Sequence, residues 1–357
     1  MNLLLIAHDF DFSNKDGIGR VSYEFNSTLN AFNYPHQTLS YGEMSALKRD
    51  IILPTKIRKI NPDIIHLLQP EGGSFAFKAK KGVIKILTLH DSPGAKLHYT
   101  KNAVLSWYDI RRKDIAIRNA DILICVSSLI KEGVVDYINK KGYKNKIIKV
   151  INLGLDKKFI FEPAYYGLRK DFVYIGSIHF PEKNIEDLLE LYKLIITKSP
   201  NSYLHIFTSS PNPISHLKDK TDIPIYLDHK PFDDTKGIIL HYQKSDEDII
   251  PILKSATALI HLSKVEGFGL PILEALALGT PVLTLDIGKI PYELKKFTIS
   301  DNLNGLLTQS LKLIEGMNTT AVSEGITYAK SQTWERFTNS IIEIYNQLPV
   351  HGEKTAF

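Results

Sequence analysis

The sequence has little of what a disulfide-stabilised, zinc-stabilised or membrane-spanning protein requires. It contains one cysteine, Cys125, among 357 residues. A single cysteine excludes an internal disulfide framework and any zinc site built on several cysteines. No apolar run approaches the roughly 20 residues that a membrane-spanning helix needs. The apolar run in the first residues, MNLLLIAHDFDF, is too short for a secretory signal peptide, and acidic residues follow it. We therefore expect a cytoplasmic protein.

Low-complexity tracts and internal repeats are also missing, so neither a disordered nor a solenoid protein is indicated. A chain of this length can bury two cores of about 150 to 200 residues each. Its charge is uneven, because residues 1–165 carry a net charge of +9 and residues 166–357 carry −4. The basic half suits a phosphate-bearing acceptor or an anionic membrane surface, although solvated lysines commonly cause such runs. No aromatic platform accompanies the charge, so no nucleic-acid partner is expected.

Short apolar runs alternate with longer helical patterns, which predicts an α/β fold. In the first half the runs are NLLLIAH, DIIHLL, VIKILTLH, DILICVS and KIIKVINL, with helices expected at 18–32, 103–119 and 129–140. In the second half they are FVYIGS, SYLHIFTS, GIILHYQ, TALIHLS and PVLTLD, with helices at 185–198, 247–253 and 271–278. We expect two Rossmann-like domains with doubly wound parallel sheets, facing each other across a cleft.

The segment GLDKKFIFEPAYYGLRKD separates the two sets of runs and lacks clear periodicity. We place the domain boundary there, with an N-terminal domain at 1–165 and a C-terminal domain at 166–357. Ligands of open α/β sheets bind beyond the carboxyl ends of the strands. The segments that follow each strand are therefore the candidate sites.

The stretch SKVEGFGLPILEALALGTPV, residues 263–282, indicates a short buried helix. Pro271 suits its first turn, and Gly279 followed by Pro281 ends it. Apolar side chains surround this helix, so it is expected inside a domain, with Glu274 as its only charge. A buried carboxylate requires donors, either ligand hydroxyls or the N–H groups of its own first turn.

Upstream of this helix, Glu266 begins a glycine-broken loop that continues through Gly267, Phe268, Gly269 and Leu270. Small residues allow backbone N–H groups to approach a ligand, and a helix N-terminus attracts anions. Two acids and an anion-binding site therefore converge in this segment.

The loop after the first strand holds two weaker candidates. Gly17 and Gly19 open a helix and could cradle a phosphate. Their spacing nearly matches a dinucleotide fingerprint, but several residues intervene after the strand, which counts against NAD. Asp9 and Asp11 resemble the Asp-x-Asp pair that holds a divalent metal in another class of sugar transferases. Two such aspartates more often cap turns, and no metal site is predicted.

Two further candidates follow strands in the two halves. His90 ends the run ILTLH and could donate a hydrogen bond into a cleft at neutral pH, or could be a buried structural histidine. Lys183 begins a helix after the run FVYIGS, where its charge suits a diphosphate or simply solvent. The position of each residue in the sequence does not decide between its two roles.

The stretch HLSKVEGFGLPILEALALGTPVL resembles the donor-site signature of the family-four retaining glycosyltransferases, which have the two-domain GT-B fold. Other landmarks of that family occur in order along nearly the whole chain, before and after this stretch. Among them are DGIGR, TLHD, ADILICVSSLIKEGV, NLGLD, YIGSIHFPEKN and TWERFTNSIIEIY. The resemblance implies that the N-terminal domain binds the acceptor and the C-terminal domain a nucleoside-diphosphate sugar. It also implies that the last helix, near 333–348, packs back toward the N-terminal domain. No metal ion or other cofactor is implied.

Carried over by position, the resemblance makes Glu266, His90 and Lys183 the expected catalytic residues. Glu266 and His90 would contact the donor sugar, Lys183 would face the diphosphate, and Glu274 would bind the ribose hydroxyls. The other expected donor-binding residues are Gly267, Phe268, Gly269, Leu270, Gly17, Gly19 and Ser177. The implied reaction retains the configuration of a hexose-type sugar through a front-face, oxocarbenium-like state.

Two positions depart from the family pattern. Ser177 stands where many relatives have an arginine, and Glu182 stands where a basic residue often precedes the lysine. A non-catalytic nucleotide-sugar-binding subunit therefore remains an alternative, as does a sugar-nucleotide epimerase or other NAD-dependent Rossmann enzyme. The acceptor is expected to be a glycan, a lipid-linked compound or another hydroxyl compound. Peripheral contact with the inner face of the membrane through 104–119, which carries Trp107 and Tyr108, is a further hypothesis.

Overall fold

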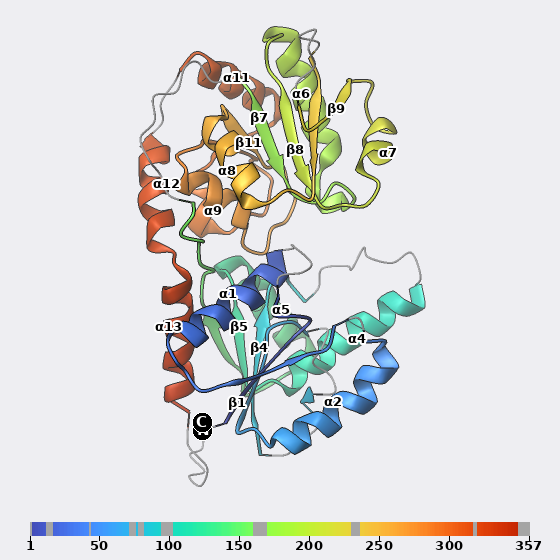
Figure 1. The fold of residues 1–357 in the computed structure, drawn as a ribbon, viewed down its shortest axis with the longest axis vertical. Helices are drawn as coiled ribbons and strands as arrows, with labels where there is room; N and C mark the ends of the chain where they lie inside the picture. The colour runs from blue at the N-terminus through green and yellow to red at the C-terminus, as the bar shows by residue number, and fades with distance from the viewer. Residues whose placement is uncertain are drawn as a thin grey trace. The chain divides into compact units, whose positions relative to one another are not determined.

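The computed structural model describes residues 2–11, 17–42, 44–70, 76–77, 82–93, 103–159, 170–229, 236–316 and 320–348. Its contacts divide the chain into two compact units, each built on a parallel sheet with helices packed on it (Figure 1). Unit 1 comprises residues 1–154 and 333–357, and unit 2 comprises residues 155–332. The expected fold of two parallel-sheet α/β domains is confirmed. The division falls after Gly154, whereas the boundary expected after residue 165 lies outside the described residues.

Unit 1 holds a six-stranded parallel sheet in the order β2-β1-β3-β4-β5-β6. The strands are β1 (Leu3–Ala7), β2 (Gln37–Ser40), β3 (Ile64–Leu67), β4 (Ile84–Leu89), β5 (Ile122–Cys125) and β6 (Ile147–Val150). The helices are α1 (Gly17–Ala31), α2 (Ala46–Ile60), α4 (Ala103–Asn119), α5 (Ser128–Lys141) and α13 (Trp334–Asn346). Every residue of β1, β3 and β5 is buried, as parallel strands covered on both faces require.

The last helix, α13, belongs to unit 1 and packs against α1. Thr333 caps its N-terminus, because its hydroxyl accepts a hydrogen bond from Arg336 N at 3.1 Å. The buried side of the helix carries Trp334, Phe337, Thr338, Ile341 and Tyr345. Beside its start, a Cβ atom on Gly154 would lie 2.5 Å from Trp334 N, so only glycine fits at that position.

Unit 2 holds a seven-stranded parallel sheet in the order β13-β12-β11-β7-β8-β10-β9. The strands are β7 (Phe172–Ile175), β8 (Leu204–Thr208), β9 (Ile225–Leu227), β10 (Ile238–Tyr242), β11 (Ala258–Ile260), β12 (Val282–Leu285) and β13 (Ile299–Asp301). The helices are η2 (Pro181–Lys183), α6 (Ile185–Lys198), α7 (Pro213–Lys218), α8 (Asp246–Ser255), α9 (Leu270–Ala277), α10 (Tyr292–Lys295), α11 (Leu303–Ile314) and α12 (Thr320–Ser331). The strand order reverses between β7 and β11, so the loops that follow these strands are the expected ligand edge.

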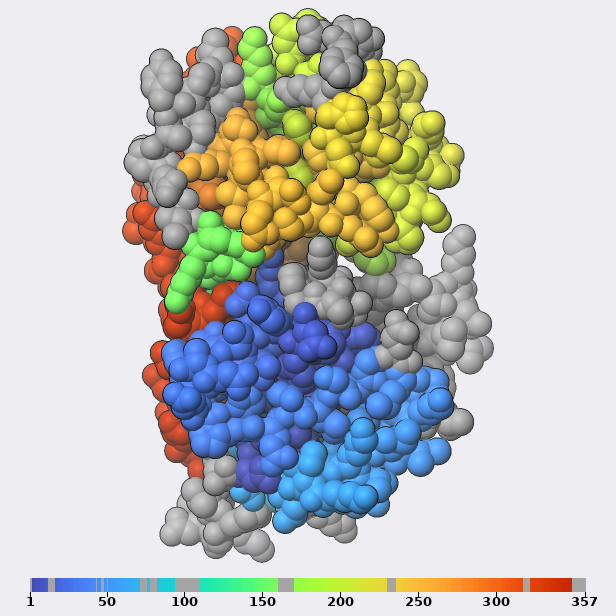
Figure 2. Space-filling view, viewed as in Figure 1, coloured from blue at the N-terminus to red at the C-terminus, as the bar shows by residue number. Residues whose placement is uncertain are grey.

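Helix α9 is the buried helix expected from the sequence. All six residues from Ile272 to Ala277 are buried, and Pro271 lies in the first turn. Gly279 follows the helix with φ 71°, a conformation that favours glycine. Helix α12 packs against α9 so closely that a Cβ on Gly325 would lie 2.8 Å from Leu276 Cδ2. The space-filling view shows the gold segment that contains α8 on the surface of unit 2 (Figure 2).

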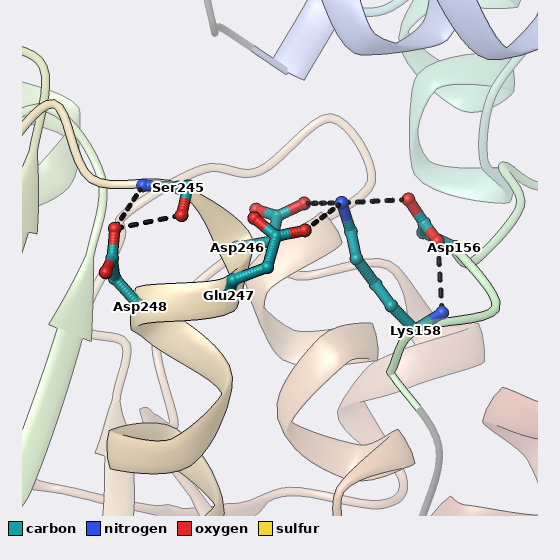
Figure 3. Close-up of polar contacts among 6 residues, drawn as sticks. All are labelled: Asp156, Lys158, Ser245, Asp246, Glu247 and Asp248. Carbon is teal, nitrogen blue, oxygen red and sulfur yellow. Dashed lines mark hydrogen bonds and ion pairs between the residues drawn. The ribbon is translucent and has the colours of Figure 1, made fainter.

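Lys158 ties the first residues of unit 2 to helix α8 (Figure 3). Its Nζ lies 2.8 Å from Asp246 Oδ2, 3.2 Å from Asp156 Oδ2 and 3.7 Å from Glu247 Oε1. Burial alone lowers the pKa of Lys158, but these carboxylates, Asp246 foremost, raise it above the ordinary value. The ammonium therefore stays charged and anchors the first turn of α8.

Within the described ranges, no helix is both long and apolar enough to cross a membrane. The side chains of Trp107 and Tyr108, for which membrane contact is hypothesised, lie outside the described residues.

Candidate active site

Backbone hydrogen bonds join three loops at the carboxyl edge of the unit 2 sheet. Lys264 N donates to Glu182 O at 2.8 Å, which links the loop after β11 to the loop after β7. Glu266 N donates to Lys289 O, and Lys289 N donates to Lys264 O, both at 2.9 Å. These two bonds link the loop after β11 to the loop after β12. The three loops therefore form one frame at the topological switch point, where ligands of open α/β sheets bind.

One carboxylate oxygen of Glu266 meets two partners. Lys183 Nζ lies 2.5 Å from Glu266 Oε1, and His261 Nε2 lies 2.9 Å from the same atom. Lys183 ends the short helix η2, and His261 directly follows β11. Glu266 is 8% exposed and His261 is 1% exposed, whereas the Lys183 side chain is 25% exposed. The structure thus brings the expected catalytic residues Glu266 and Lys183 into direct contact.

The electrostatic surroundings keep Glu266 ionised. Burial by itself raises the pKa of Glu266, because a medium of low dielectric disfavours the charged form. The Lys183 ammonium and His261 outweigh burial and hold the pKa below the ordinary value for glutamate. Among the described residues Oε2 has no hydrogen-bond partner. A carboxylate with one oxygen held and the other open can accept a sugar hydroxyl or stabilise positive charge on a sugar ring.

The turn that enters α9 presents a row of backbone donors. Gly269, at the helix start, has φ 99°, and the first turn contains no acidic side chain. In the described structure, the N–H groups of Phe268, Gly269 and Leu270 donate to no acceptor. Open N–H groups and the helix dipole together attract anions. This turn therefore suits a phosphate group.

The start of helix α8, at the same edge, is unsuited to anions. Its first turn holds Asp246, Glu247 and Asp248. Asp248 Oδ2 already accepts hydrogen bonds from Ser245 N at 3.0 Å and Ser245 Oγ at 2.9 Å (Figure 3). Helix α6 also begins with two acids. A negatively charged ligand is therefore favoured at α9 over α8 or α6.

Two buried polar atoms close to Glu266 in the chain lack partners within the described residues. They are His261 Nδ1 and Ser263 Oγ. An unsatisfied buried polar group costs about 1–3 kcal/mol, and such groups in native proteins usually meet water or a ligand. Both belong to the segment between β11 and α9. They add to the indication that this edge receives a polar ligand.

Other residues expected at the donor site also belong to unit 2. Glu274 lies on the second turn of α9 and is 7% exposed, so the expected burial of its carboxylate is confirmed. Ser177 Oγ lies 3.0 Å from Ser210 Oγ and accepts a hydrogen bond from His179 N at 3.3 Å. Ser177 thus supports the loop that leads to Lys183, but it adds no positive charge where an arginine would. Phe268 is buried and Gly267 is half-buried.

The last three expected residues belong to unit 1. Helix α1 begins at Gly17, and Gly19 is buried in its first turn, as expected for this helix start. Residues 12–16, before it, lie outside the described part. His90 follows β4 and its Nε2 lies 2.9 Å from Leu68 O, so Nε2 donates to that carbonyl. His90 borders a small pocket. The other lining residues are Ile18, Pro70, Leu89, Asp91, Ser92, Pro93, Lys113 and Ile117.

The described part of the chain contains no cluster of three or more His, Cys, Asp or Glu side chains that could hold a metal ion. Of the two aspartates considered for a metal pair, Asp9 places Oδ2 2.8 Å from Nδ1 of its neighbour His8. Asp11 is exposed. The local pairing of Asp9 agrees with a turn-forming role for this segment.

Sequence reasoning did not single out His261 or Lys289. A histidine in the run TALIHLS resembles a core residue, and the available signal was its place directly after a strand, five positions before Glu266. Lys289 joins the site through a parallel bridge between Val265 and Lys289. No local sequence pattern indicates a pairing between two loops.

Comparison with known proteins relates both units to glycosyltransferases. Residues 28–159 match the family described as Glycosyltransferase Family 4, and residues 156–318 match Glycosyl transferases group 1. An uncharacterized glycosyltransferase of Methanocaldococcus jannaschii is 25% identical over 344 residues, which cover 92% of this chain and 88% of that protein. The MMP alpha-(1->4)-mannosyltransferase of Mycolicibacterium hassiacum is 25% identical over 242 residues, which cover 64% of this chain and 54% of that protein.

Among solved structures, sucrose-phosphate synthase from Thermosynechococcus elongatus has the same fold. The TM-score is 0.71 at 15% identity, over 97% of this chain and 98% of that one. The two family matches adjoin and together span most of the chain, in the order expected from the sequence landmarks. The chain therefore belongs to the glycosyltransferases of the GT-B fold, of the family-four type.

Proposed function

We propose that this chain is a retaining glycosyltransferase that moves a hexose-type sugar from a nucleoside-diphosphate sugar to a hydroxyl acceptor without a metal ion. One observation carries the proposal: a buried, ionised Glu266 contacts Lys183 in the loop frame that leads into the acid-free start of α9. A cation and open N–H groups suit a diphosphate, and a carboxylate suits the sugar joined to it. A nucleotide sugar offers both partners in one molecule.

In the proposed complex the diphosphate lies against Lys183 and the N–H groups of residues 268–270. Glu274 accepts hydrogen bonds from the ribose hydroxyls, and Glu266 accepts one from the donor sugar. The cation and the helix start stabilise the negative charge that develops on the departing nucleoside diphosphate. This electrostatic role is the one that a divalent metal ion would otherwise serve.

The proposed reaction takes place on one face of the sugar. The bond between sugar C1 and the phosphate oxygen breaks, and its electron pair passes to the phosphate. The acceptor oxygen bonds to C1 from the same side, and its proton passes to the departing phosphate. Ionised Glu266 stabilises the oxocarbenium-like sugar between these events. No separate protein base is needed, and the configuration at C1 is retained.

We further propose that unit 1 binds the acceptor, at the surface around the small pocket beside His90. The walls of this pocket are largely apolar, while Lys113 and Asp91 give it charged groups. A glycan and a lipid-linked hydroxyl compound are both acceptor classes for this site. Peripheral membrane contact and a cytoplasmic location stay predictions from the sequence.

A thermal-shift screen tests the donor site without knowledge of the acceptor. Purified protein is melted in EDTA with GDP, UDP, ADP and their hexose conjugates, with GDP-mannose first because the relative from M. hassiacum is a mannosyltransferase. A ligand that binds only the folded state at about 100 times its Kd stabilises by about 2.7 kcal/mol. One nucleotide is expected to raise the melting temperature. The Lys183→Ala variant should lose that shift, and the control Lys198→Ala, an exposed lysine of α6, should keep it.

Turnover is then measured with the donor that binds. We expect the release of nucleoside diphosphate. We also expect the NMR spectrum of the product to show the same anomeric configuration as the donor. Failure of every nucleotide to shift a cooperatively melting protein would count against the donor site. A product of inverted configuration would refute the retaining mechanism.

A further inference from the structure

His261 is the rigid partner of Glu266. It directly follows strand β11, is 1% exposed, and places Nε2 2.9 Å from Glu266 Oε1. Lys183, the other partner of the same oxygen, ends a three-residue helix and has a side chain that is 25% exposed. The two contacts therefore differ in mobility, since a lysine has four rotatable side-chain bonds and a buried imidazole is held by its packing.

The chemistry of the contact determines where the histidine proton lies. Glu266 is ionised, so it can only accept, and the hydrogen in this bond belongs to His261 Nε2. His261 Nδ1 has no hydrogen-bond partner within the described residues. The arrangement therefore fits a ring whose Nε2–H is directed at the carboxylate.

We propose that His261 is a positioning residue that holds Glu266 in place while Lys183 engages the donor diphosphate; this inference rests on the proposed function. When the ammonium shares its charge with phosphate, its hold on Glu266 weakens. The histidine then keeps Oε1 in place and leaves Oε2 for a hydroxyl of the sugar.

Two substitutions separate the hydrogen bond from the space that the ring fills. His261→Gln places an amide N–H near the position of Nε2, whereas His261→Leu keeps an apolar side chain of moderate size and donates nothing. Loss of one oriented donor at an active site lowers kcat on the order of 10-fold to 100-fold. We expect His261→Leu to lose kcat in this range with little change in KM for the donor, and His261→Gln to recover most of it.

The pH dependence of the rate distinguishes a positioning role of His261 from a merely structural one. Without the His261 donor, burial of Glu266 is opposed by Lys183 alone, so the pKa of Glu266 rises. The acidic limb of the rate profile should therefore move to higher pH in His261→Leu and stay in place in His261→Gln. A kcat and an acidic limb in His261→Leu that match the wild type would overturn the proposal.

An NMR measurement on the wild-type protein keeps the test independent of turnover and of variant folding. The ring ¹⁵N shifts of His261 should show a protonated Nε2. A proton on Nδ1 with a bare Nε2 would overturn the proposed bond. Failure of every nucleotide in the screen to bind would count against the proposed function, while the ring tautomer would still decide whether His261 donates to Glu266.

Discussion

The hydroxyl of Tyr345, in the last helix, lies 2.5 Å from Nδ1 of His66 on strand β3. His66 Nε2 lies 2.8 Å from Thr88 Oγ1 on strand β4, so both ring nitrogens have partners in the core of unit 1. Helix α13 is therefore joined to the sheet by a buried polar contact as well as by its apolar side. Such a contact favours one arrangement of the helix, because any other leaves polar groups buried without partners.

This contact predicts that unit 1 loses stability in mild acid. Burial, followed by the charge interaction with His90, lowers the pKa of His66 to about 3. The ordinary value in an unfolded chain is about 6.5, so between these values the unfolded state binds more protons. The contribution of His66 is complete above pH 6.5 and declines as the pH falls, by up to about 1.4 kcal/mol per pH unit.

Urea unfolding at pH 7 and pH 5, followed by tryptophan fluorescence, measures this decline, because both tryptophans belong to unit 1. The wild type should lose about 2 kcal/mol between the two pH values through His66. His66→Gln should be less stable at pH 7 but should lose less on acidification. His229→Gln, at an exposed histidine of unit 2, serves as the control. An equal loss in His66→Gln and the wild type would contradict the prediction.

Gly269→Ala should weaken nucleotide binding by disturbing the donors at the start of α9. Gly269 has φ 99°, and an added Cβ would lie 3.1 Å from Ile272 Cδ1. Backbone strain of about 1–3 kcal/mol is expected, and relief of that strain would move the adjacent N–H groups. Titration calorimetry with the nucleoside diphosphate that binds should show an affinity lowered on the order of 10-fold or more.

Gly316→Ala is the matched control for this experiment. Gly316 has φ 92°, but an added Cβ there meets nothing within 4 Å. The substitution imposes similar backbone strain at a position after α11. It should lower the melting temperature and leave nucleotide affinity unchanged. Equal losses of affinity in both variants would show that strain alone is responsible.

Much of the fold was predictable, because buried parallel strands are short apolar runs that local sequence reveals. The runs at β1, β3, β4 and β5, and the helix at α6, were predicted on this basis. The missed elements have weak local patterns. Strand β2 has one buried residue, Leu39, and strands β9 and β13 are three-residue strands without a buried residue. Helix α2 contains Pro54, and a proline in a sequence pattern usually indicates the end of a helix.

The candidate site was predictable where its residues are close in sequence. Glu266, Glu274 and the glycines between them share one segment, so their association follows from the signature itself. The contact between Lys183 and Glu266 joins residues 83 positions apart and depends on β7 lying beside β11. A sequence reveals which strands end in polar residues, but strand order is set by the packing of the whole sheet. His261 is only five positions from Glu266, and it was missed because a histidine in the apolar run TALIHLS resembles a core residue.

Glu274→Gln should weaken nucleotide binding while unit 2 stays folded. The substitution keeps the size of the side chain on buried helix α9 but removes the charge that would strengthen the proposed hydrogen bonds from ribose hydroxyls. Hydrogen bonds to charged groups contribute about 1.5–3 kcal/mol, so affinity should fall on the order of 10-fold to 100-fold. A deoxyribose form of the same nucleotide provides the control, since it should bind the variant and the wild type with similar affinity. A variant that still prefers ribose as strongly as the wild type would contradict this role.

The Lys183–Glu266 contact should show strong energetic coupling in a double-mutant cycle. Lys183→Met removes the cation and leaves a carboxylate that is 8% exposed, so burial then raises the pKa of Glu266. Breaking a buried pair from one side costs about 3 kcal/mol, whereas Glu266→Gln in the same background removes the stranded charge. Calorimetric unfolding should therefore show that the double variant loses much less stability than the two single variants combined. The exposed pair Lys193 and Asp222, 3.2 Å apart, provides a control cycle in which the effects should nearly add. Additive losses at Lys183 and Glu266 would mean that the contact does not hold the loops after β7 and β11 together in solution.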